Sequence, residues 1–244
     1  CIGAVLHTLN PRLFPEQIAW IINHAEDTHV FYDITFQPIV EAIKDKVPSV
    51  KHWIVLTDAA HKPQSSIANL RTYEEYIGGQ STDVVWGDFP EDTACGLCYT
   101  SGTTGDPKGV LYSHRSNILH TMIGLQKDAI GIGAADATLP VVPMFHANAW
   151  GLAFSGPATG SKLVLPGAKM DGESIYELLE NEKVTFTAAV PTVWLMLLQY
   201  LESTNKKLPH LKRVVIGGSA VPERILRAFE ENYEVEVVHA WGMT

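Results

Sequence analysis

Cysteine, long apolar runs and clustered positive charge are all scarce in this chain. Its 244 residues include three cysteines, at positions 1, 95 and 98. The sequence shows no signal peptide and no apolar run of about 18 residues, which excludes a transmembrane segment and favours a reducing, cytoplasmic setting. The net charge is −9 and no basic block occurs. Nucleic acid is therefore not expected as a partner.

The remaining composition is that of an ordinary globular protein, with 46% hydrophobic and 18% charged residues. Cys95 and Cys98 form a C-x-x-C pair, but both lie in an apolar stretch where side chains three apart point to opposite faces. Buried structural thiols are favoured over a metal or redox pair. The chain starts in apolar register without a Met, which predicts that it begins inside a fold.

Small and hydroxyl residues are densest between Tyr99 and Gly109, flanked by two apolar stretches that read as strands. Glycines let a backbone approach a ligand, and successive loop N–H groups form anion-binding concavities. Hydroxyls donate hydrogen bonds and Lys108 adds a point charge. This pattern favours polyphosphate binding over a plain linker. It is not a Walker A loop, because Pro107 stands where that motif has Gly and a strand follows rather than a helix.

Alternating apolar stretches predict an α/β fold, with mixed or parallel sheets flanked by helices. We expect helices at 16–25, 35–46, 73–77, 114–127, 171–181, 191–203 and 222–231. We expect strands at 30–32, 53–56, 94–99, 109–113, 136–143, 161–165, 184–190, 211–216 and 235–238.

Two further stretches have ordinary structural explanations when taken alone. The residues from Met144 to Trp150 read slightly better as a helix start than as a site. The Gly217-Gly218 turn lies where open α/β sheets bind ligands, yet a tight β–α turn is the simpler interpretation.

The loop Tyr-Thr-Ser-Gly-Thr-Thr-Gly-Asp-Pro-Lys-Gly-Val, at 99–110, resembles the signature of the adenylate-forming superfamily. Pro-Met-Phe-His-x-Asn-Ala-Trp, ending at Trp150, resembles the acyl-site motif of its acyl-CoA synthetase branch. Ala-Val-Pro-Thr, Gly-Gly-Ser-Ala and the final Trp-Gly-Met-Thr also match. The resemblance covers nearly the whole chain. It implies that residues 1–244 are part of the large N-terminal AMP-binding domain and that the smaller C-terminal lid domain, with its catalytic lysine, is missing. Trp241 stands where the family usually has Tyr, and the Glu that would bind Mg²⁺ is absent after Thr244.

The resemblance also implies roles for individual residues and the ligands ATP, Mg²⁺ and CoA. The phosphates would be bound by Ser101, Gly102, Thr103, Thr104, Gly105 and Lys108. Thr100 would contribute to Mg²⁺. Adenine and the α-phosphate would contact Gly218, Ser219, Ala220, Trp241, Gly242 and Thr244. The carboxylic acid would lie near His146 and Trp150, with Ala189 and Val190 in the pocket wall, and His146 and Lys108 would serve the reaction.

The expected parent reaction is ATP-dependent ligation of a fatty, short or medium-chain acid to CoA through an acyl-adenylate. The fragment alone is expected to be inactive. Medium- and long-chain synthetases and methylmercaptopropionate-CoA ligases are equally compatible. An aryl-CoA ligase, a peptide-synthetase adenylation domain and a nucleotide-binding module without catalysis stay open, as does a homodimer.

Overall fold

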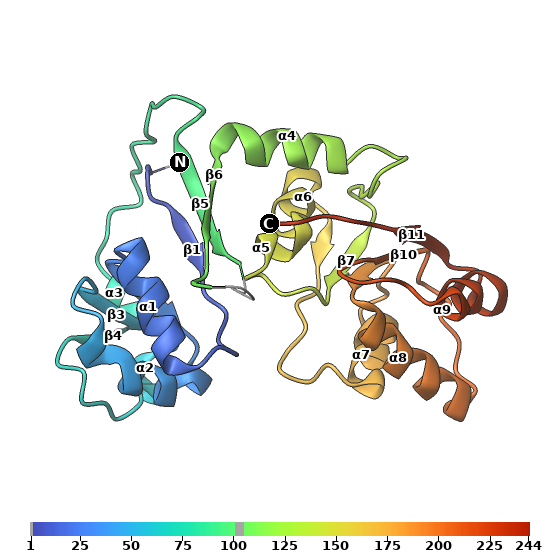
Figure 1. Ribbon diagram of the computed structural model, residues 1–244, viewed down its shortest axis with the longest axis horizontal. Coiled ribbons are helices and arrows are strands. Elements are labelled where there is room, and N and C mark those ends of the chain that lie inside the picture. Colours follow the sequence, from blue (N-terminus) through green and yellow to red (C-terminus); the bar gives the residue numbers. More distant parts are fainter. Residues whose placement is uncertain (1, 101–104) are drawn as a thin grey trace. The chain divides into compact units, whose positions relative to one another are not determined.

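The computed structural model describes residues 2–100 and 105–244. These residues form two compact units. Unit 1 consists of Cys1–Phe89 and Tyr99–Gly109, and unit 2 consists of Pro90–Cys98 and Val110–Thr244. Within each unit, helices pack against short strands (Figure 1).

Unit 1 is built on a parallel sheet with the strand order β2-β3-β4. Its strands and α-helices are β1 (Leu6–Thr8), α1 (Pro15–Ala25), β2 (His29–Tyr32), α2 (Gln37–Ile43), β3 (His52–Val55), β4 (Leu70–Thr72) and α3 (Tyr73–Ile77). Short 3-10 turns occupy Ile34–Phe36, Lys44–Lys46 and Ala59–His61. Because side chains alternate along a strand, Val30, Tyr32, Trp53 and Val55 share the face that packs in the core with residues of α1 and α2.

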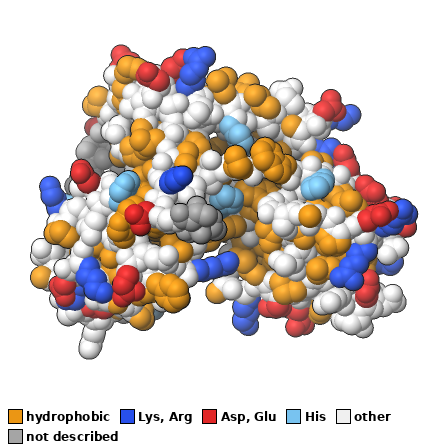
Figure 2. Space-filling model, in the orientation of Figure 1, with side chains coloured by type: hydrophobic (Ala, Val, Ile, Leu, Met, Phe, Trp, Pro, Cys, Tyr) orange, Lys and Arg blue, Asp and Glu red, His pale blue; other side chains and the backbone are white. Residues whose placement is uncertain are grey.

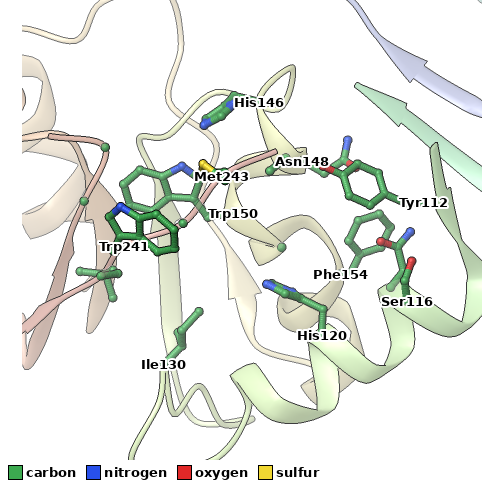
Figure 3. Close-up of a pocket in the computed structure, with 18 residues that line it drawn as sticks. Tyr112, Ser116, His120, Ile130, His146, Asn148, Trp150, Phe154, Trp241 and Met243 are labelled. Atoms are coloured by element: carbon green, nitrogen blue, oxygen red, sulfur yellow. The ribbon is translucent and has the colours of Figure 1, made fainter. Parts of the chain in front are cut away.

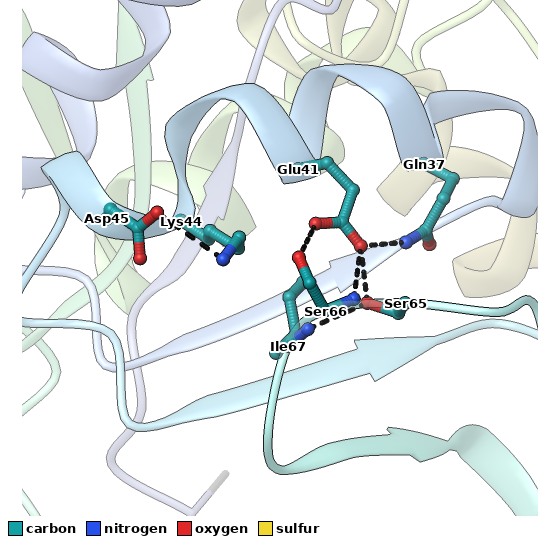
Figure 4. Close-up of polar contacts among 7 residues, drawn as sticks. All are labelled: Gln37, Glu41, Lys44, Asp45, Ser65, Ser66 and Ile67. Carbon is teal, nitrogen blue, oxygen red and sulfur yellow. Dashed lines mark hydrogen bonds and ion pairs between the residues drawn. The ribbon is translucent and has the colours of Figure 1, made fainter.

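The segment before β4 is tied to α2 by the carboxylate of Glu41 (Figure 4). It accepts hydrogen bonds from the Oγ atoms of Ser65 and Ser66, at 2.5 and 2.6 Å, and from the backbone N–H of Ser66 at 3.0 Å. The Gln37 side-chain amide donates a further bond at 2.9 Å. These bonds hold in place a loop that has no regular secondary structure. They also lower the pKa of Glu41 from 4.5 to about 2.

Unit 2 contains a parallel sheet of five strands in the order β11-β10-β9-β7-β8. Its strands and α-helices are β5 (Ala94–Tyr99, whose last residue belongs to unit 1), β6 (Gly109–Ser113, whose first residue belongs to unit 1), α4 (His114–Gly124), β7 (Ala137–Pro140), α5 (Ala147–Trp150), α6 (Leu152–Thr159), β8 (Lys162–Leu163), α7 (Gly172–Asn181), β9 (Phe186–Ala189), α8 (Pro191–Thr204), β10 (Arg213–Ile216), α9 (Glu223–Arg227) and β11 (Glu236–His239). A π-helical turn, Ala228–Asn232, follows α9.

Large side chains from α8 and from the turn after α9 pack in the main core of unit 2. Trp194 and Phe229 are both fully buried and meet edge to face, with ring centroids 5.5 Å apart. Val214, Val215 and Ile216 of β10 are buried on both faces of the sheet, as expected for a central parallel strand. This packing fixes the carboxyl end of β10, where the Gly217-Gly218 turn begins.

The α/β fold with helix-flanked parallel sheets is confirmed, but several boundaries differ from the expected ones. The helix expected at 35–46 is broken into a 3-10 turn, α2 and a second 3-10 turn, because Pro38 lacks an N–H and Asp33 caps the first turn through the Thr35 N–H. The helix expected at 114–127 ends at Gly124, although Ser113 caps its start as predicted. The strands expected at 136–143 and 161–165 are shorter.

The surface of α4 is unusually apolar, with Ile118, Leu119, Met122 and Ile123 all exposed. Figure 2 shows hydrophobic side chains along the upper surface where this helix runs. Cys98 of β5 is buried, as expected of a structural thiol. Cys95 is only half-buried, contrary to that expectation, and its Sγ accepts a bond from Asn117 Nδ2 at 3.1 Å. No helix in the described ranges is long and apolar enough to cross a bilayer.

Candidate active site

Unit 2 encloses a pocket of about 400 Å³. In Figure 3, Trp150 and Trp241 lie on one side of it and Tyr112, Ser116 and Phe154 lie on the other. One wall is therefore formed by two indoles, and the opposite wall combines the rings of Tyr112 and Phe154 with polar groups from β6 and α4. A mostly apolar cavity with a few convergent polar groups is typical of small-molecule sites.

The pocket brings together residues that the sequence places almost 100 positions apart. Five of the predicted site residues line it: His146, Trp150, Gly218, Trp241 and Gly242. A sixth, Thr244, is hydrogen-bonded to this group through its Oγ1, which lies 3.1 Å from Nδ1 of His146. Residues predicted for the acid and residues predicted for the nucleotide thus border one cavity.

The indole of Trp150 packs directly on the glycine turn after β10. A Cβ atom added to Gly217 would lie 3.2 Å from Cη2 of this indole and 2.8 Å from the carbonyl oxygen of Ala240. Gly218 has φ +83°, and a Cβ there would lie 3.1 Å from Cγ1 of Val190. Both glycines are needed because side chains at these positions would displace the aromatic wall or the backbone behind it.

Helix α5 is a left-handed turn rather than an ordinary helix start. The φ angles of Ala147, Asn148, Ala149 and Trp150 are 43°, 46°, 55° and 56°, and Gly151 follows at 82°. Each left-handed residue other than glycine costs about 1–2 kcal/mol, and such strain is typical of functional sites. Of these four residues, only Asn148 reduces this cost, because its short polar side chain can hydrogen-bond locally. The turn places both His146, which precedes it, and Trp150 at the pocket.

Four other predicted residues lie outside the pocket lining. Ala189 is fully buried in the unit 2 core. Val190 lies behind Gly218 and supports the turn from outside the cavity. Ser219 and Ala220 are exposed beyond the turn. Their predicted contacts with acid or adenine stay predictions.

Four polar residues that were not among the predicted site residues also line the pocket: Tyr112, Ser116, Asn117 and His120. Tyr112 has a buried hydroxyl without a hydrogen-bond partner among the described residues, and burial, followed by the nearby Cys98, raises its pKa. The imidazole of His120 lies against Gly151, whose hypothetical Cβ would be 2.6 Å from the ring Cε1. The sequence of α4 held one indication of this wall: Ser116, Asn117 and His120 recur at the spacing of one helical turn, so they share one face. In the structure that face lines the pocket, and the apolar residues of α4 face solvent.

The phosphate-loop prediction falls in unit 1, and Ser101, Gly102, Thr103 and Thr104 lie outside the described residues. The two ends of the loop are joined by hydrogen bonds. The N–H of Thr100 donates to the carbonyl of Lys108 at 3.0 Å, and the N–H of Lys108 donates to Thr100 Oγ1 at 3.2 Å. Gly105 has φ +147°, and the Lys108 ammonium pairs with no carboxylate in the described ranges.

Tyr99, the residue before this loop, is held by an aromatic cluster in unit 1. Its hydroxyl lies 2.6 Å from Nδ1 of His24, whose ring stacks on Trp20 at 4.7 Å. His7, paired with Asp27 at 2.8 Å, lies 5.2 Å from the Tyr99 ring. This packing anchors the base of the loop.

The donors present fit a nucleotide-borne Mg²⁺ rather than a metal ion held by protein alone. Mg²⁺ takes oxygen ligands and commonly keeps phosphate and water oxygens among them. The Thr100 hydroxyl is such a donor and retains a lone pair after accepting from Lys108. In the described part of the chain, no three His, Cys, Asp or Glu residues are grouped so that they could hold a metal.

A family model described as AMP-binding enzyme matches residues 1–244. The chain belongs to this family. It is 48% identical over 242 residues to the 3-methylmercaptopropionyl-CoA ligase of Ruegeria lacuscaerulensis, and 48% identical over 242 residues to the medium-chain-fatty-acid–CoA ligase of Ectopseudomonas oleovorans. These alignments cover 99% of the chain but only 45% and 44% of those two proteins. The chain thus spans a little under half the length of these relatives.

Solved structures share the fold of this chain. The anthranilate CoA ligase AuaEII in complex with anthranoyl-AMP superposes with a TM-score of 0.87 at 24% identity, over 98% of this chain and 45% of that one. The N-terminal domain of FACL13 from Mycobacterium tuberculosis gives 0.81 at 22% identity, over 99% of this chain and 57% of that one. The resemblance inferred from the motifs is confirmed.

Proposed function

We propose that this chain is part of an ATP-dependent acid–CoA ligase. The proposal rests on one pocket bordered by His146, Trp150, Gly218 and Trp241 in a member of the AMP-binding enzyme family. The relatives named above are both CoA ligases. Residues 1–244 would form part of the N-terminal AMP-binding domain, and a C-terminal lid domain would complete the enzyme.

The proposed reaction has two steps. A carboxylate oxygen of the acid attacks the α-phosphorus of ATP, so that an acyl-adenylate forms and pyrophosphate leaves. The CoA thiolate then attacks the acyl carbonyl carbon, forming the thioester while AMP leaves with the bonding electrons. Because the carboxylate is already a nucleophile, the protein needs to position the reactants and neutralise phosphate charge.

The residues of unit 2 have distinct proposed tasks in this reaction. Trp241 stacks on adenine, and Gly218, with Gly242, lets the flat base approach the backbone. Thr244 contacts the α-phosphate, and its hydrogen bond to His146 links that contact to the acid. Trp150 limits the acyl end of the pocket.

Unit 1 supplies the phosphate-binding residues in this proposal. Lys108 neutralises the β- and γ-phosphates, with backbone and hydroxyl donors of the loop around it. Thr100 offers an oxygen to Mg²⁺, which supplies further charge neutralisation when bound. A cytoplasmic location and a homodimer stay predictions.

The size of the pocket favours an acid of short or medium length. Its volume of about 400 Å³ lies near the lower end of the usual range for small-molecule sites, and it would have to hold the adenylate as well as the acyl group. Each buried methylene contributes about 0.8 kcal/mol, so affinity should rise with chain length until the space against Trp150 is filled. A 3-(methylthio)propanoate-like acid and a medium-chain fatty acid both meet this condition.

Acid-dependent pyrophosphate release tests the proposal in the whole protein that carries this chain. With ATP, Mg²⁺ and a panel of acids, pyrophosphate should appear only when an acid is present, and CoA should be consumed in equal amount. Pyrophosphate release without CoA consumption would instead indicate an adenylation domain. Saturable nucleotide binding with no pyrophosphate release would indicate a binding module and overturn the proposal.

A further inference from the structure

An uncompensated cluster of cationic and aromatic side chains lies on the β2-β3-β4 sheet of unit 1. His29 and His52 are paired across the two parallel strands, and their rings lie 4.4 Å apart with a 33° tilt. The guanidinium of Arg71, on β4, approaches His52 with Nη2 at 3.0 Å from Nδ1. Tyr76 of α3 completes the cluster, with the Arg71 Cζ 4.7 Å from its ring centroid.

This cluster occupies the face of the sheet opposite the core. The intervening residues Val30 and Trp53 point into the core that contains α1 and α2, so strand alternation places His29 and His52 on the other side. His29 is exposed, and His52 and Arg71 are half-buried. The cluster is therefore accessible to a small ligand and takes no part in the hydrophobic core of unit 1.

The hydrogen bond between Arg71 and His52 defines which groups remain available. A guanidinium has only donors, so Nδ1 of His52 must accept, and neutral His52 carries its proton on Nε2. That N–H and the remaining N–H groups of Arg71 form no hydrogen bond with any described residue. These two residues therefore leave only donors for a ligand, while Nδ1 of His29 lies 2.9 Å from Oγ1 of Thr28.

The charge around these donors is positive and unpaired. Neither Arg71 nor the neighbouring Lys51 forms an ion pair with a carboxylate in the described ranges, although Asp and Glu outnumber Lys and Arg by 27 to 18 in this chain. Partial burial of the ring, and then the charges of His52, Arg71 and Lys51, lower the pKa of His29. A bound anion would relieve this repulsion.

We propose that His29, His52 and Arg71 form a binding site for the phosphate group of a small ligand. A phosphate accepts several charge-assisted hydrogen bonds at once, and arginine is suited to binding it with two parallel bonds. Phe31, 47% exposed and 5.8 Å from the Tyr76 ring, offers an apolar surface beside the site. The ligand is therefore inorganic phosphate or a phosphate monoester with a flat ring. This site does not depend on the proposed ligase activity.

Histidine NMR signals provide a test that is specific to this location. The chain is titrated with inorganic phosphate, and separately with AMP, at constant ionic strength maintained with chloride, and the Hε1 signals are assigned with His29→Gln and His52→Gln. Phosphate should shift both signals saturably and raise the pKa of His29, because an anion favours the charged form of the ring. AMP binding more tightly than phosphate would show that the ring contacts Phe31.

Two variants distinguish binding at this site from nonspecific attraction of phosphate by the positive charges of the protein. Arg71→Gln should weaken phosphate binding about tenfold or more, as expected for loss of a charge-assisted bond. Arg227→Gln removes the same charge from an arginine already paired with Glu223 and Glu231 and should leave binding unchanged. If Arg71→Gln does not fold, His29→Gln changes an exposed side chain and should weaken the response of the His52 signal. Signals that do not respond to phosphate, or an equal loss in Arg71→Gln and Arg227→Gln, would overturn the site.

Discussion

The close contact between His120 and Gly151 leads to a quantitative prediction about the pocket. Gly151 follows the left-handed turn with φ +82°, and a Cβ at this position would lie 2.6 and 2.7 Å from Cε1 and Nδ1 of His120. Gly151→Ala therefore has two costs, one from the backbone and one from the displaced imidazole. Both can be estimated separately.

The backbone cost is about 1–2 kcal/mol for a left-handed alanine, partly offset by about 0.4–1 kcal/mol from the lower entropy of the unfolded chain. Moving the exposed His120 ring off its position adds about 0.5–1.5 kcal/mol if the side chain is forced from its rotamer. Gly160 is a matched control, since it has φ +73° but nothing within 4 Å of a hypothetical Cβ. Gly160→Ala should show the backbone cost alone.

Urea unfolding followed by tryptophan fluorescence measures both variants. Gly151→Ala should be less stable than Gly160→Ala by about 0.5–1.5 kcal/mol. His120→Ala should remove this difference when combined with Gly151→Ala, giving a coupling of the same size. If the two glycine variants lose equal stability, or if the double-mutant cycle shows no coupling, His120 does not lie on Gly151 and this part of the pocket is wrong.

Three further predictions concern Glu41, Trp194 and Lys108. The folded-state pKa of Glu41, about 2, lies below its ordinary value of 4.5 because of the bonds from Ser65 and Ser66 (Figure 4). Its contribution to stability is therefore complete above that ordinary value and is lost as the pH falls toward 2, so Glu41→Gln should flatten the acid side of a thermal-unfolding profile; an unchanged profile would contradict the network. Trp194→Ala, at a fully buried site, should lower the free energy of urea unfolding by about 3–5 kcal/mol. Trp86→Ala, at a site 66% exposed, should change it by no more than about 0.5 kcal/mol. Similar losses of stability in the two variants would place Trp194 outside the core. In the whole protein that carries this chain, Lys108→Ala should reduce kcat/KM for ATP by the equivalent of about 1.5–3 kcal/mol if the proposed function holds. Lys169→Ala is an exposed control. Unchanged ATP kinetics would contradict the proposed role of Lys108.

Local sequence patterns predicted the main elements because their signals act over a few residues. The apolar run before Tyr99 gave β5 with its observed ends, and Ser113 was identified as a cap because its hydroxyl satisfies a free N–H at the start of α4. The motifs around His146, Gly218 and Trp241 were recognised without knowing that they meet. Their meeting depends on the order β11-β10-β9-β7-β8, which no local pattern encodes.

Neither the left-handed turn α5 nor the pocket wall formed by β6 and α4 could be predicted from the sequence, and the reasons are related. Alanine has no preference for positive φ, so nothing in Ala147 or Ala149 indicates α5; the surrounding packing imposes it. Tyr112 and His120 carry no motif, and their place in the site appears only when the fold brings β6 and α4 to the same pocket as Gly151. Helix α4 also reverses the usual rule, since its apolar residues are exposed and its polar residues line the pocket.

Calorimetric titration with a non-hydrolysable acyl-adenylate analogue tests the central claim, that the pocket of unit 2 holds adenylate and acyl group together. The chain should bind one analogue molecule, with affinity that rises with acyl length until the pocket is filled. Trp241→Ala should weaken binding by about 1–3 kcal/mol, the usual contribution of a base stacked on an aromatic ring, while Trp86→Ala should not. Equal binding of AMP and of every acyl analogue, or equal affinity in both tryptophan variants, would contradict the assignment of this pocket.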